Sequence, residues 1–305
     1  NLNFKNLIMH RRHFLQNSML TLGALSLGKQ KILKAMSVDP WKITMLTNDI
    51  GIFTERGGTI AFHFSNEGIT VVDAQFPDTA QHLIDELKKR KDQPFRLLIN
   101  THHHGDHTAG NIDFKDLVKR VLAHENSLAN QKKVAAANNS EDKQLYPNQT
   151  FSKDWNEDIG GEKIALYYYG AAHTNGDSIT HFENANIAHV GDLVFNRRHP
   201  FVDHSAGASM KNWVNVLDST MKKFDNKTIF ICGHSGSDFD VQGQKDMLLA
   251  FQDYLQNVLK FVGGEIKSGK TKEEILKATE IPGSPEWKGD GIERPLTAAF
   301  EELSV

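Results

Sequence analysis

The chain is poor in cysteine, in net charge and in long apolar runs, and each shortage excludes a class of protein. Its 305 residues include one cysteine, Cys232, so no internal disulfide can form and the thiol does not reveal the redox compartment. We expect this cysteine to be packed in the core, because it ends the apolar run 229–232. The net charge of −3 and the pI near 6.6 give no electrostatic case for nucleic acid or an anionic membrane as a partner.

No apolar run after residue 37 is long enough to span a bilayer, and no repeat or low-complexity tract occurs there. Hydrophobic residues make up 39% of the chain and charged residues 24%, the composition of an ordinary globular protein that can bury a full core. Histidine is the residue present in excess. The chain has 15 histidines, and four of them fall within residues 102–107.

The N-terminus carries a pattern typical of exported proteins. The pair Arg11-Arg12 lies ahead of a short apolar run over residues 19–27, which is too short to anchor the chain in a bilayer. The order resembles a twin-arginine export signal, with departures at His10 and Gln16, where Ser or Thr and Lys are usual. The alternative is an amphipathic helix that stays on the protein.

This pattern sets the expected domain organisation. We expect an N-terminal extension with a signal peptide over residues 1–37 and one folded domain, ending in a helical tail, over residues 38–305. The expected location is the periplasm or the medium, with no membrane span in the mature protein. The oligomeric state cannot be predicted from the sequence.

Alternation of strands and helices predicts an α/β domain. Short strand-like runs separated by turn residues come first, at 42–46, 50–54, 59–64 and 68–72. Helical spacing and apolar runs then alternate, with helices at 79–91, 125–137, 210–224 and 241–262 and strands at 96–100, 163–169, 179–182, 187–190 and 227–232. The tail over 271–304 has a helical pattern interrupted by Pro282, Pro285 and Pro295. Two sheets with helices outside them, in a single four-layer domain, fit this order.

The histidine-rich segment has the ligand types of a zinc site. Imidazole and carboxylate both bind zinc readily. His102 and His104 are two residues apart, so both side chains can point to one side of an extended segment. Gly105 then lets the chain bend sharply, which redirects Asp106 and His107. The segment follows an apolar strand, where α/β proteins place their sites; an adventitious histidine-rich loop is the alternative.

Three further candidate ligands lie beside or close to glycines at the ends of predicted strands: His173, Asp192 and His234. Each is a weak signal alone, but together with the histidine-rich segment they make a strong one. His103 lies between two candidate ligands and is expected to point away from them, with a structural role.

The order of these residues, with Asp73 at the end of the 68–72 run, resembles the five-motif set of the metallo-β-lactamase superfamily over residues 42–262. The resemblance implies an αββα sandwich with a binuclear zinc site at the edge of the two sheets. It implies that one zinc ion is held by His102, His104 and His173. It implies that the second is held by Asp106, His107 and His234, that Asp192 bridges the two, and that Asp73 supports the ligands from behind.

The chemistry of such a site is hydrolytic. Two divalent cations about 3.5–4 Å apart share a hydroxide that is a nucleophile at neutral pH. Asp106 is the candidate catalytic residue, because it can orient the hydroxide and pass a proton to the leaving group. We therefore predict a two-zinc hydrolase that attacks the carbonyl of a small-molecule amide, lactone, ester or thioester.

Asp192 separates this chain from the best-known metallo-β-lactamases, which carry Cys at this position and Lys three residues on, where this chain has Phe195. Arg197 and Arg198 offer planar charges for a carboxylate, and with His204 they are our candidate substrate contacts. Two alternatives stay open: genuine β-lactamase activity on β-lactam antibiotics, and a metal-bearing binding or sensor module without turnover.

Overall fold

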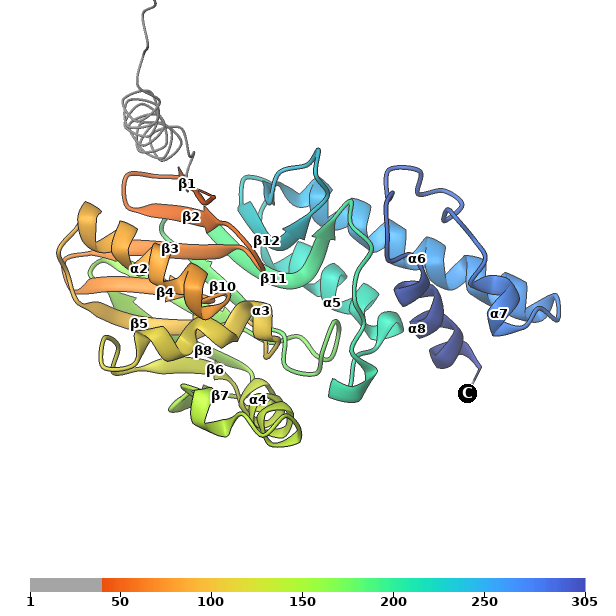
Figure 1. Cartoon of the computed structure of the whole chain (residues 1–305). Helices are drawn as coiled ribbons and strands as arrows, with labels where there is room; N and C mark the ends of the chain where they lie inside the picture. Colours follow the sequence, from red (N-terminus) through yellow and green to blue (C-terminus); the bar gives the residue numbers. More distant parts are fainter. Residues whose placement is uncertain (1–39, 305) are drawn as a thin grey trace, which may run out of the picture. The chain divides into compact units, whose positions relative to one another are not determined.

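The structure is a computed structural model that describes residues 40–304. The predicted export signal and the boundary between residues 37 and 38 lie outside the described residues. The part from Trp41 onward forms one compact unit of two face-to-face β-sheets with helices on the outer side of each (Figure 1). Among residues 40–304, no helix combines the length and hydropathy that a bilayer span needs.

The first sheet contains seven strands in chain order within the described residues. They are β1 (Lys42–Met45), β2 (Ile50–Thr54), β3 (Ile60–Ser65), β4 (Gly68–Val72), β5 (Phe95–Asn100), β6 (Val121–His124) and β7 (Gln149–Phe151). Pairing is antiparallel from β1 to β4 and parallel from β4 to β7. The helical segments of this half are α2 (Pro77–Arg90), α3 (Gly105–Thr108), η1 (Ala109–Phe114), α4 (Glu125–Ala137) and η2 (Glu141–Lys143).

The second sheet contains six strands in the order β13-β12-β11-β10-β9-β8. Their bounds are β8 (Asp154–Ile159), β9 (Glu162–Tyr167), β10 (Ile179–Phe182), β11 (Ile187–Asn196), β12 (Ile229–Ser235) and β13 (Gln242–Gly243). Only β11 and β12 pair in parallel. The helical segments of this half are η3 (His204–Ala206), α5 (Met210–Lys223), α6 (Lys245–Lys267), α7 (Lys272–Ile275) and α8 (Glu293–Leu303).

Three apolar layers hold these elements together. The central layer lies between the sheets and joins side chains such as Ile99 and Leu122 of the first sheet to Leu166 and Ile231 of the second. The outer layers pack α2 on the first sheet, and α5, α6 and α8 on the second. The predicted four-layer αββα sandwich is therefore confirmed.

The strand predicted over 187–190 is much longer than expected. β11 continues to Asn196 and therefore passes through Asp192 instead of ending before it. Gly191 has a φ of 52°, and the pairing of β11 with β12 shifts register on both sides of it. A β-bulge of this kind bends a strand and re-aims a side chain without ending the pairing.

Four strands were not predicted: β6, β7, β8 and the two-residue β13, which lies within the helix predicted over 241–262. β6 and β7 are only four and three residues long, and β8 reads Asp-Trp-Asn-Glu-Asp-Ile at the edge of its sheet, with few residues that favour strands. The expected interruption at Pro295 is also wrong. Pro295 lies in the first turn of α8, where the missing N–H costs nothing because it has no partner within the helix.

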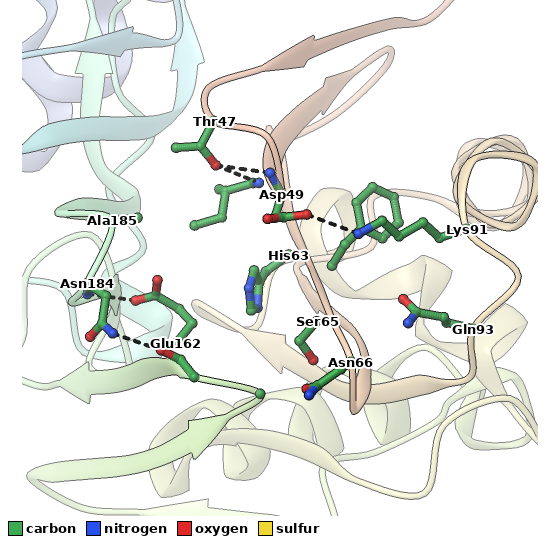
Figure 2. A pocket seen from close by; sticks show the side chains of 14 residues that line it. Thr47, Asp49, His63, Ser65, Asn66, Lys91, Gln93, Glu162, Asn184 and Ala185 are labelled. Atoms are coloured by element: carbon green, nitrogen blue, oxygen red, sulfur yellow. Dashed lines mark hydrogen bonds and ion pairs between the residues drawn. The ribbon is translucent and has the colours of Figure 1, made fainter.

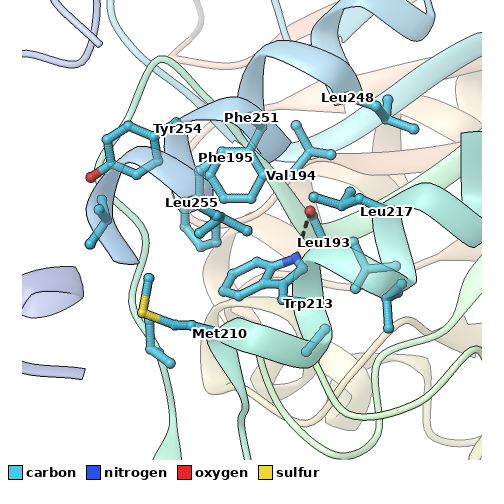
Figure 3. Packing of buried hydrophobic residues seen from close by; sticks show 14 of the residues in the cluster. Leu193, Val194, Phe195, Met210, Trp213, Leu217, Leu248, Phe251, Tyr254 and Leu255 are labelled. Carbon is cyan, nitrogen blue, oxygen red and sulfur yellow. Dashed lines mark hydrogen bonds between the residues drawn. The ribbon is translucent and has the colours of Figure 1, made fainter. Parts of the chain in front are cut away.

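Trp213 is the largest fully buried side chain of the layer under α5 and α6 (Figure 3). Its ring packs edge-on against Phe251, with centroids 5.4 Å apart, and its indole Nε1 donates a hydrogen bond of 3.0 Å to the Leu193 carbonyl. Leu193 follows Asp192 in β11, so this packing also steadies the strand that carries a candidate ligand.

A Trp213→Ala variant is expected to lose roughly 3–5 kcal/mol of the free energy of unfolding, since it leaves a large cavity and an unpaired carbonyl. Denaturant titration of the variant and the parent protein measures this loss. The matched Trp213→Phe variant keeps an aromatic ring and is expected to lose less. An Ala variant as stable as the Phe variant would contradict the role of the indole in this layer.

Candidate metal centre

All seven predicted ligands come together at one edge of the sandwich. His102 and His104 follow the end of β5, and Asp106 and His107 lie in the short α3. The other three come from the second sheet or its loops: His173 after β9, Asp192 in β11 and His234 in β12. This is the edge where the parallel strands of both sheets point their carboxyl ends, as is usual for sites in α/β folds.

Four of the ligand atoms form a first group. His104 Nδ1 lies 3.1 Å from His102 Nε2 and 2.9 Å from His173 Nε2. Asp192 Oδ2 lies 3.9 Å from His102 Nε2 and 3.5 Å from His173 Nε2, and the four residues can offer atoms that are all within 4.8 Å of one another. Zinc–nitrogen bonds of about 2.0–2.1 Å at tetrahedral angles place two ligand nitrogens about 3.3 Å apart, so the spacing suits one cation.

The remaining three residues form a second group beside it. Asp106 Oδ2 lies 3.1 Å from His234 Nε2 and 3.8 Å from His107 Nε2, and the two histidine nitrogens are 3.4 Å apart. Asp192 reaches this group as well, with Oδ1 3.1 Å from His107 Nε2 and Oδ2 3.4 Å from His234 Nε2. Its carboxylate therefore lies between the two groups.

The electrostatics of the first group favour a cation. Burial, together with the neighbouring histidines, lowers the pKa of His173 to about 3 and that of His102 well below its usual range. Both imidazoles are therefore neutral, with lone pairs free to coordinate. Asp192 is buried, and its carboxylate lies among histidine nitrogens of both groups. A buried carboxylate is costly unless it is paired, and a bound cation would pair it.

The second group holds protons when no metal is present. Although burial disfavours the imidazolium, the carboxylates of Asp192 and Asp106 raise the pKa of His234 to about 9. Burial also opposes ionisation of Asp106, but its hydrogen bond with His234 and the charge of His107 lower its pKa to about 2. The same carboxylate effects, from Asp192 and Asp73, outweigh burial at His107 and raise its pKa well above the usual range.

Metal binding is therefore expected to release protons, about one to two per protein near neutral pH, because the cation replaces the protons of the second group. Affinity should rise as the pH rises toward the pKa of His234, since fewer protons then have to be displaced. Titration of zinc into metal-free protein in a weakly buffered indicator solution measures the release. Binding without proton release, or affinity independent of pH, would contradict this charge balance.

Asp73 holds the ring of His107 through the ring nitrogen that faces away from the other ligands. Its Oδ2 lies 2.7 Å from His107 Nδ1 and accepts a 2.7 Å hydrogen bond from the Thr101 hydroxyl, and its Oδ1 accepts from the Thr101 N–H at 2.8 Å. Asp73 is fully buried and has a φ of 67°. A carboxylate on the far nitrogen fixes the ring and its tautomer, so that Nε2 faces the site.

Asp203 does the same for His104 and was not predicted from the sequence. Its Oδ2 lies 3.0 Å from His104 Nε2 and 3.5 Å from His103 Nε2, while its Oδ1 accepts from the Ser205 hydroxyl at 2.6 Å. His103 thus contacts a supporting carboxylate, in keeping with the structural role predicted for it. Two residues before Asp203, the Phe201 carbonyl lies 2.8 Å from His173 Nδ1, so this loop orients two histidines of the first group.

An Asp203→Asn variant is expected to bind one of two metal ions about 10–100-fold more weakly, because the ring of His104 loses its charged partner. Competition with a chromophoric chelator measures both affinities. Asp225→Asn, which changes a carboxylate that contacts residues 186, 227 and 228, is the control and should bind metal like the parent. An equal loss of affinity for both metal ions, or no loss for either, would contradict a role confined to His104.

Two glycines allow the backbone to approach the ligands. A Cβ at Gly58 would overlap the ring of His107, and a Cβ at Gly233 would overlap the carboxylate of Asp192. The Gly58 N–H also donates to the Asp106 carbonyl at 3.0 Å. From the sequence, Gly58 belongs only to the turn residues between the runs 50–54 and 59–64, because close approach to a residue far along the chain leaves no local signal.

The three predicted substrate contacts lie in different places. Arg198 lines the cavity over the ligands, but Arg197 and His204 do not. Arg197 pairs with Glu286 at 3.1 Å, and its guanidinium lies over the rings of Phe239 and Trp287. His204 lies 3.3 Å from Glu301. Successive residues of this loop point in different directions, and residues of the tail, Glu286 and Glu301, pair with these two side chains.

The cavity over the ligands has a volume of about 320 Å³. Its wall combines the rings of Phe195 and Phe201 with the cationic side chains of Arg198 and Arg294. Arg294 comes from the first turn of α8 and was not predicted, since it is more than a hundred residues from Asp192. His199, which also lines the cavity, is held by a contact of 2.7 Å between its Nδ1 and the Tyr254 hydroxyl.

A larger cavity, of about 660 Å³, lies at the opposite ends of the strands (Figure 2). The start of β9 and the β3–β4 turn line it, and its polar side chains include His63, Lys91, Glu162 and Asn184. None of these belongs to the groups of three or more candidate metal ligands found among residues 40–304. The metal chemistry of the described residues is therefore confined to the opposite edge.

Comparison with known proteins agrees with this geometry. The family model of the metallo-beta-lactamase superfamily matches residues 59–234. The 2,4-dinitroanisole O-demethylase subunit alpha of Nocardioides sp. (strain JS1661) is 29% identical over 164 residues, which are 53% of this chain and 47% of that subunit. This chain therefore spans about half the length of that relative. The metallo-beta-lactamase type 2 of Bacillus cereus is 23% identical over 70% of this chain and 82% of that enzyme.

A solved structure shows the same fold. The metallo-beta-lactamase from Pontibacter korlensis superposes with a TM-score of 0.60 at 21% sequence identity, over 71% of this chain and 99% of that protein. At this identity the likeness concerns the fold.

Proposed function

The chain belongs to the metallo-beta-lactamase superfamily, a group of metal-dependent hydrolases, and from this premise we propose that it binds two zinc ions and hydrolyses a small molecule at a carbonyl group. The bond attacked is an amide, lactone, ester or thioester. The observation that carries the proposal is the carboxylate of Asp192, which lies within 4 Å of histidine nitrogens of both ligand groups.

The donor set supports zinc. Five of the ligand residues are histidines and two are aspartates, and neutral imidazole with a few carboxylates suits zinc better than the all-oxygen sets of magnesium and calcium. One ligand group has four residues and the other has three, and Asp192 of the first group also lies close to the second. This arrangement is evidence for two ions. Two such ions supply a hydroxide nucleophile and polarise the carbonyl under attack.

The residues of the chain then position the substrate and move the proton. The side chain of Asp106 is 32% exposed, whereas those of His102, His107 and Asp192 are no more than 4% exposed, so Asp106 faces the cavity. From that position its carboxylate can accept the proton of the nucleophile and return it to the leaving group. Phe195 and Phe201 supply the apolar part of the cavity wall.

A metal analysis with a hydrolysis panel tests this proposal. We expect about two zinc ions per chain and turnover of at least one of a cephalosporin, a lactone, an ester and a thioester. 2,4-Dinitroanisole is included because of the O-demethylase relative. Protein with two bound zinc ions that hydrolyses none of these would instead support the binding or sensor module.

Genuine β-lactamase activity is the second candidate. The similarity to the Bacillus cereus enzyme and the cationic Arg198 beside the cavity favour it. The cephalosporin arm of the panel distinguishes the two: a value of kcat/KM that is highest for the cephalosporin would favour the lactamase, and a highest value for a lactone or thioester would favour the broader hydrolase.

We also propose that the protein is exported, on the pattern around Arg11 and Arg12 alone. A fusion of residues 1–37 to a reporter that is active only outside the cytoplasm tests this, with Arg11→Lys/Arg12→Lys as the matched control. Equal reporter activity in both fusions would contradict a twin-arginine route.

A further inference from the structure

We propose that the larger cavity, at the ends of the strands opposite the metal ligands, binds a small organic amine that also carries a hydroxyl group. The cavity lies between turns of both sheets, and its volume of about 660 Å³ suits a small molecule (Figure 2). One wall comes from the β1–β2 and β3–β4 turns and the segment before β5, and the other from the β8–β9 and β10–β11 turns. None of the candidate metal ligands lines it, so this proposal does not depend on the proposed hydrolytic function.

His63 of β3 lines the cavity from the first sheet and has no polar partner. The residue is only 5% exposed, yet neither nitrogen of its ring makes a hydrogen bond with any of residues 40–304. Burial lowers the pKa of His63 against the opposing charge of Asp49, so the ring is neutral at neutral pH and offers one donor and one acceptor. Because buried polar groups are nearly always paired, an unpaired ring at a cavity wall indicates a partner that enters from the cavity.

Glu162, the first residue of β9, lines the cavity from the second sheet (Figure 2). It is 8% exposed, and no cationic side chain of residues 40–304 lies within ion-pair distance of its carboxylate. Its Oε1 accepts a hydrogen bond of 2.8 Å from the Asn184 N–H. Burial outweighs the N–H groups of Asn184 and Ala185 and raises the pKa of Glu162. A buried carboxylate without a positive partner is unfavourable, so a cation in the cavity would stabilise it.

The lysine that lines this cavity does not neutralise Glu162. Lys91 Nζ lies 3.0 Å from Asp49 Oδ1 and over the ring of Phe64, 5.2 Å from its centroid. Asp49 and Lys91 therefore balance each other, and Glu162 is the third and last residue of the lining that is charged at neutral pH. The cavity has a net negative charge, which favours a ligand with one positive charge.

The other groups of the lining determine what else the ligand carries. Phe64 is buried and lies under Lys91, so its ring is not free to stack on a sugar or an aromatic ligand. The two groups that need partners are the carboxylate of Glu162 and the neutral ring of His63. A primary ammonium group supplies three N–H donors to the carboxylate, in charge-assisted hydrogen bonds. A hydroxyl group both donates and accepts, so it pairs with the imidazole in either tautomer.

Three probes with the same carbon chain test this proposal: 4-amino-1-butanol, butylamine, which lacks the hydroxyl, and 1,4-butanediol, which lacks the charge. Each is titrated into isotope-labelled full-length protein, with and without zinc, and the dissociation constant is read from the shifts of amide NMR signals. We expect the amino alcohol to bind at least about tenfold more tightly than the diol, and more tightly than butylamine. The signals of Gly161, Asn184 and Ala185 should shift, and zinc should leave the dissociation constants unchanged.

Three variants assign the contacts. Glu162→Gln keeps an oxygen for the Asn184 N–H but removes the charge, so it should abolish the preference for the amino alcohol over the diol. His63→Phe keeps a ring of similar size and should abolish the preference for the amino alcohol over butylamine. Glu183→Gln is the matched control, because Glu183 adjoins Asn184 but pairs with Lys163 at 2.9 Å and does not line the cavity. It should bind all three probes like the parent protein.

The parent protein alone can overturn the proposal. No binding of the amino alcohol, or equal binding of the amino alcohol and the diol, would mean that the cavity holds solvent only. Binding that requires zinc would place the amine at the metal centre and would also overturn it. A preference for the amino alcohol over the diol that survives in Glu162→Gln would do the same. Failure to bind zinc would refute the proposed function and leave this site unaffected, so the two proposals fail separately.

Discussion

An Asp106→Ala variant is expected to lose about 10²–10⁴-fold in kcat on any substrate that the protein hydrolyses, because it removes the group that handles the proton. Asp106 is also a ligand candidate of the second group, 3.1 Å from His234 Nε2. The loss therefore has two possible origins, and steady-state kinetics must be accompanied by metal analysis of the same samples.

The matched control is Asp106→Asn, which keeps the size of the side chain and an oxygen for the metal but cannot accept a proton as a base. If Asp106 moves the proton, the Asn variant should retain its metal and still lose most of kcat. Recovery of kcat in the Asn variant would assign Asp106 to metal binding alone. Full activity in the Ala variant would refute both roles.

The fold was predictable from local patterns because its two sheets alternate with helices in chain order. Helix α2 illustrates this: Pro77 occupies the first turn, Leu83 and Leu87 face the core, and Lys88–Arg90 suit the helix end. The short strands β6 and β7 could not be predicted in this way. Three or four residues carry too little periodicity, and these strands exist because a parallel neighbour pairs with them.

The ligands were predictable because the sequence places histidine and aspartate, residue types that zinc binds, beside or near glycines at the ends of predicted strands. The residues around these ligands could not be predicted in the same way. Asp203 appeared only as part of a polar loop, and its position 3.0 Å from His104 depends on the course of the chain after β11. Arg294 was hidden in the same way, since the packing of α8 brings it to the cavity. Local sequence shows the type of a residue, whereas tertiary packing decides its neighbours.

An Asp192→Asn variant is expected to bind fewer than two metal ions and to lose at least about 10²-fold in kcat, because its carboxylate lies between both ligand groups. The substitution keeps the volume of the side chain and removes the negative charge that balances the second ligand group. Asp73 contacts, among the ligands, only the far nitrogen of His107, so Asp73→Asn is the control for a smaller effect. It should lower the affinity for one metal ion by about 10–100-fold. Metal analysis after dialysis and kcat measured on the same samples test both. Two tightly bound ions in the Asp192→Asn variant would show that the ligand groups act independently, and the central role of Asp192 would then be wrong.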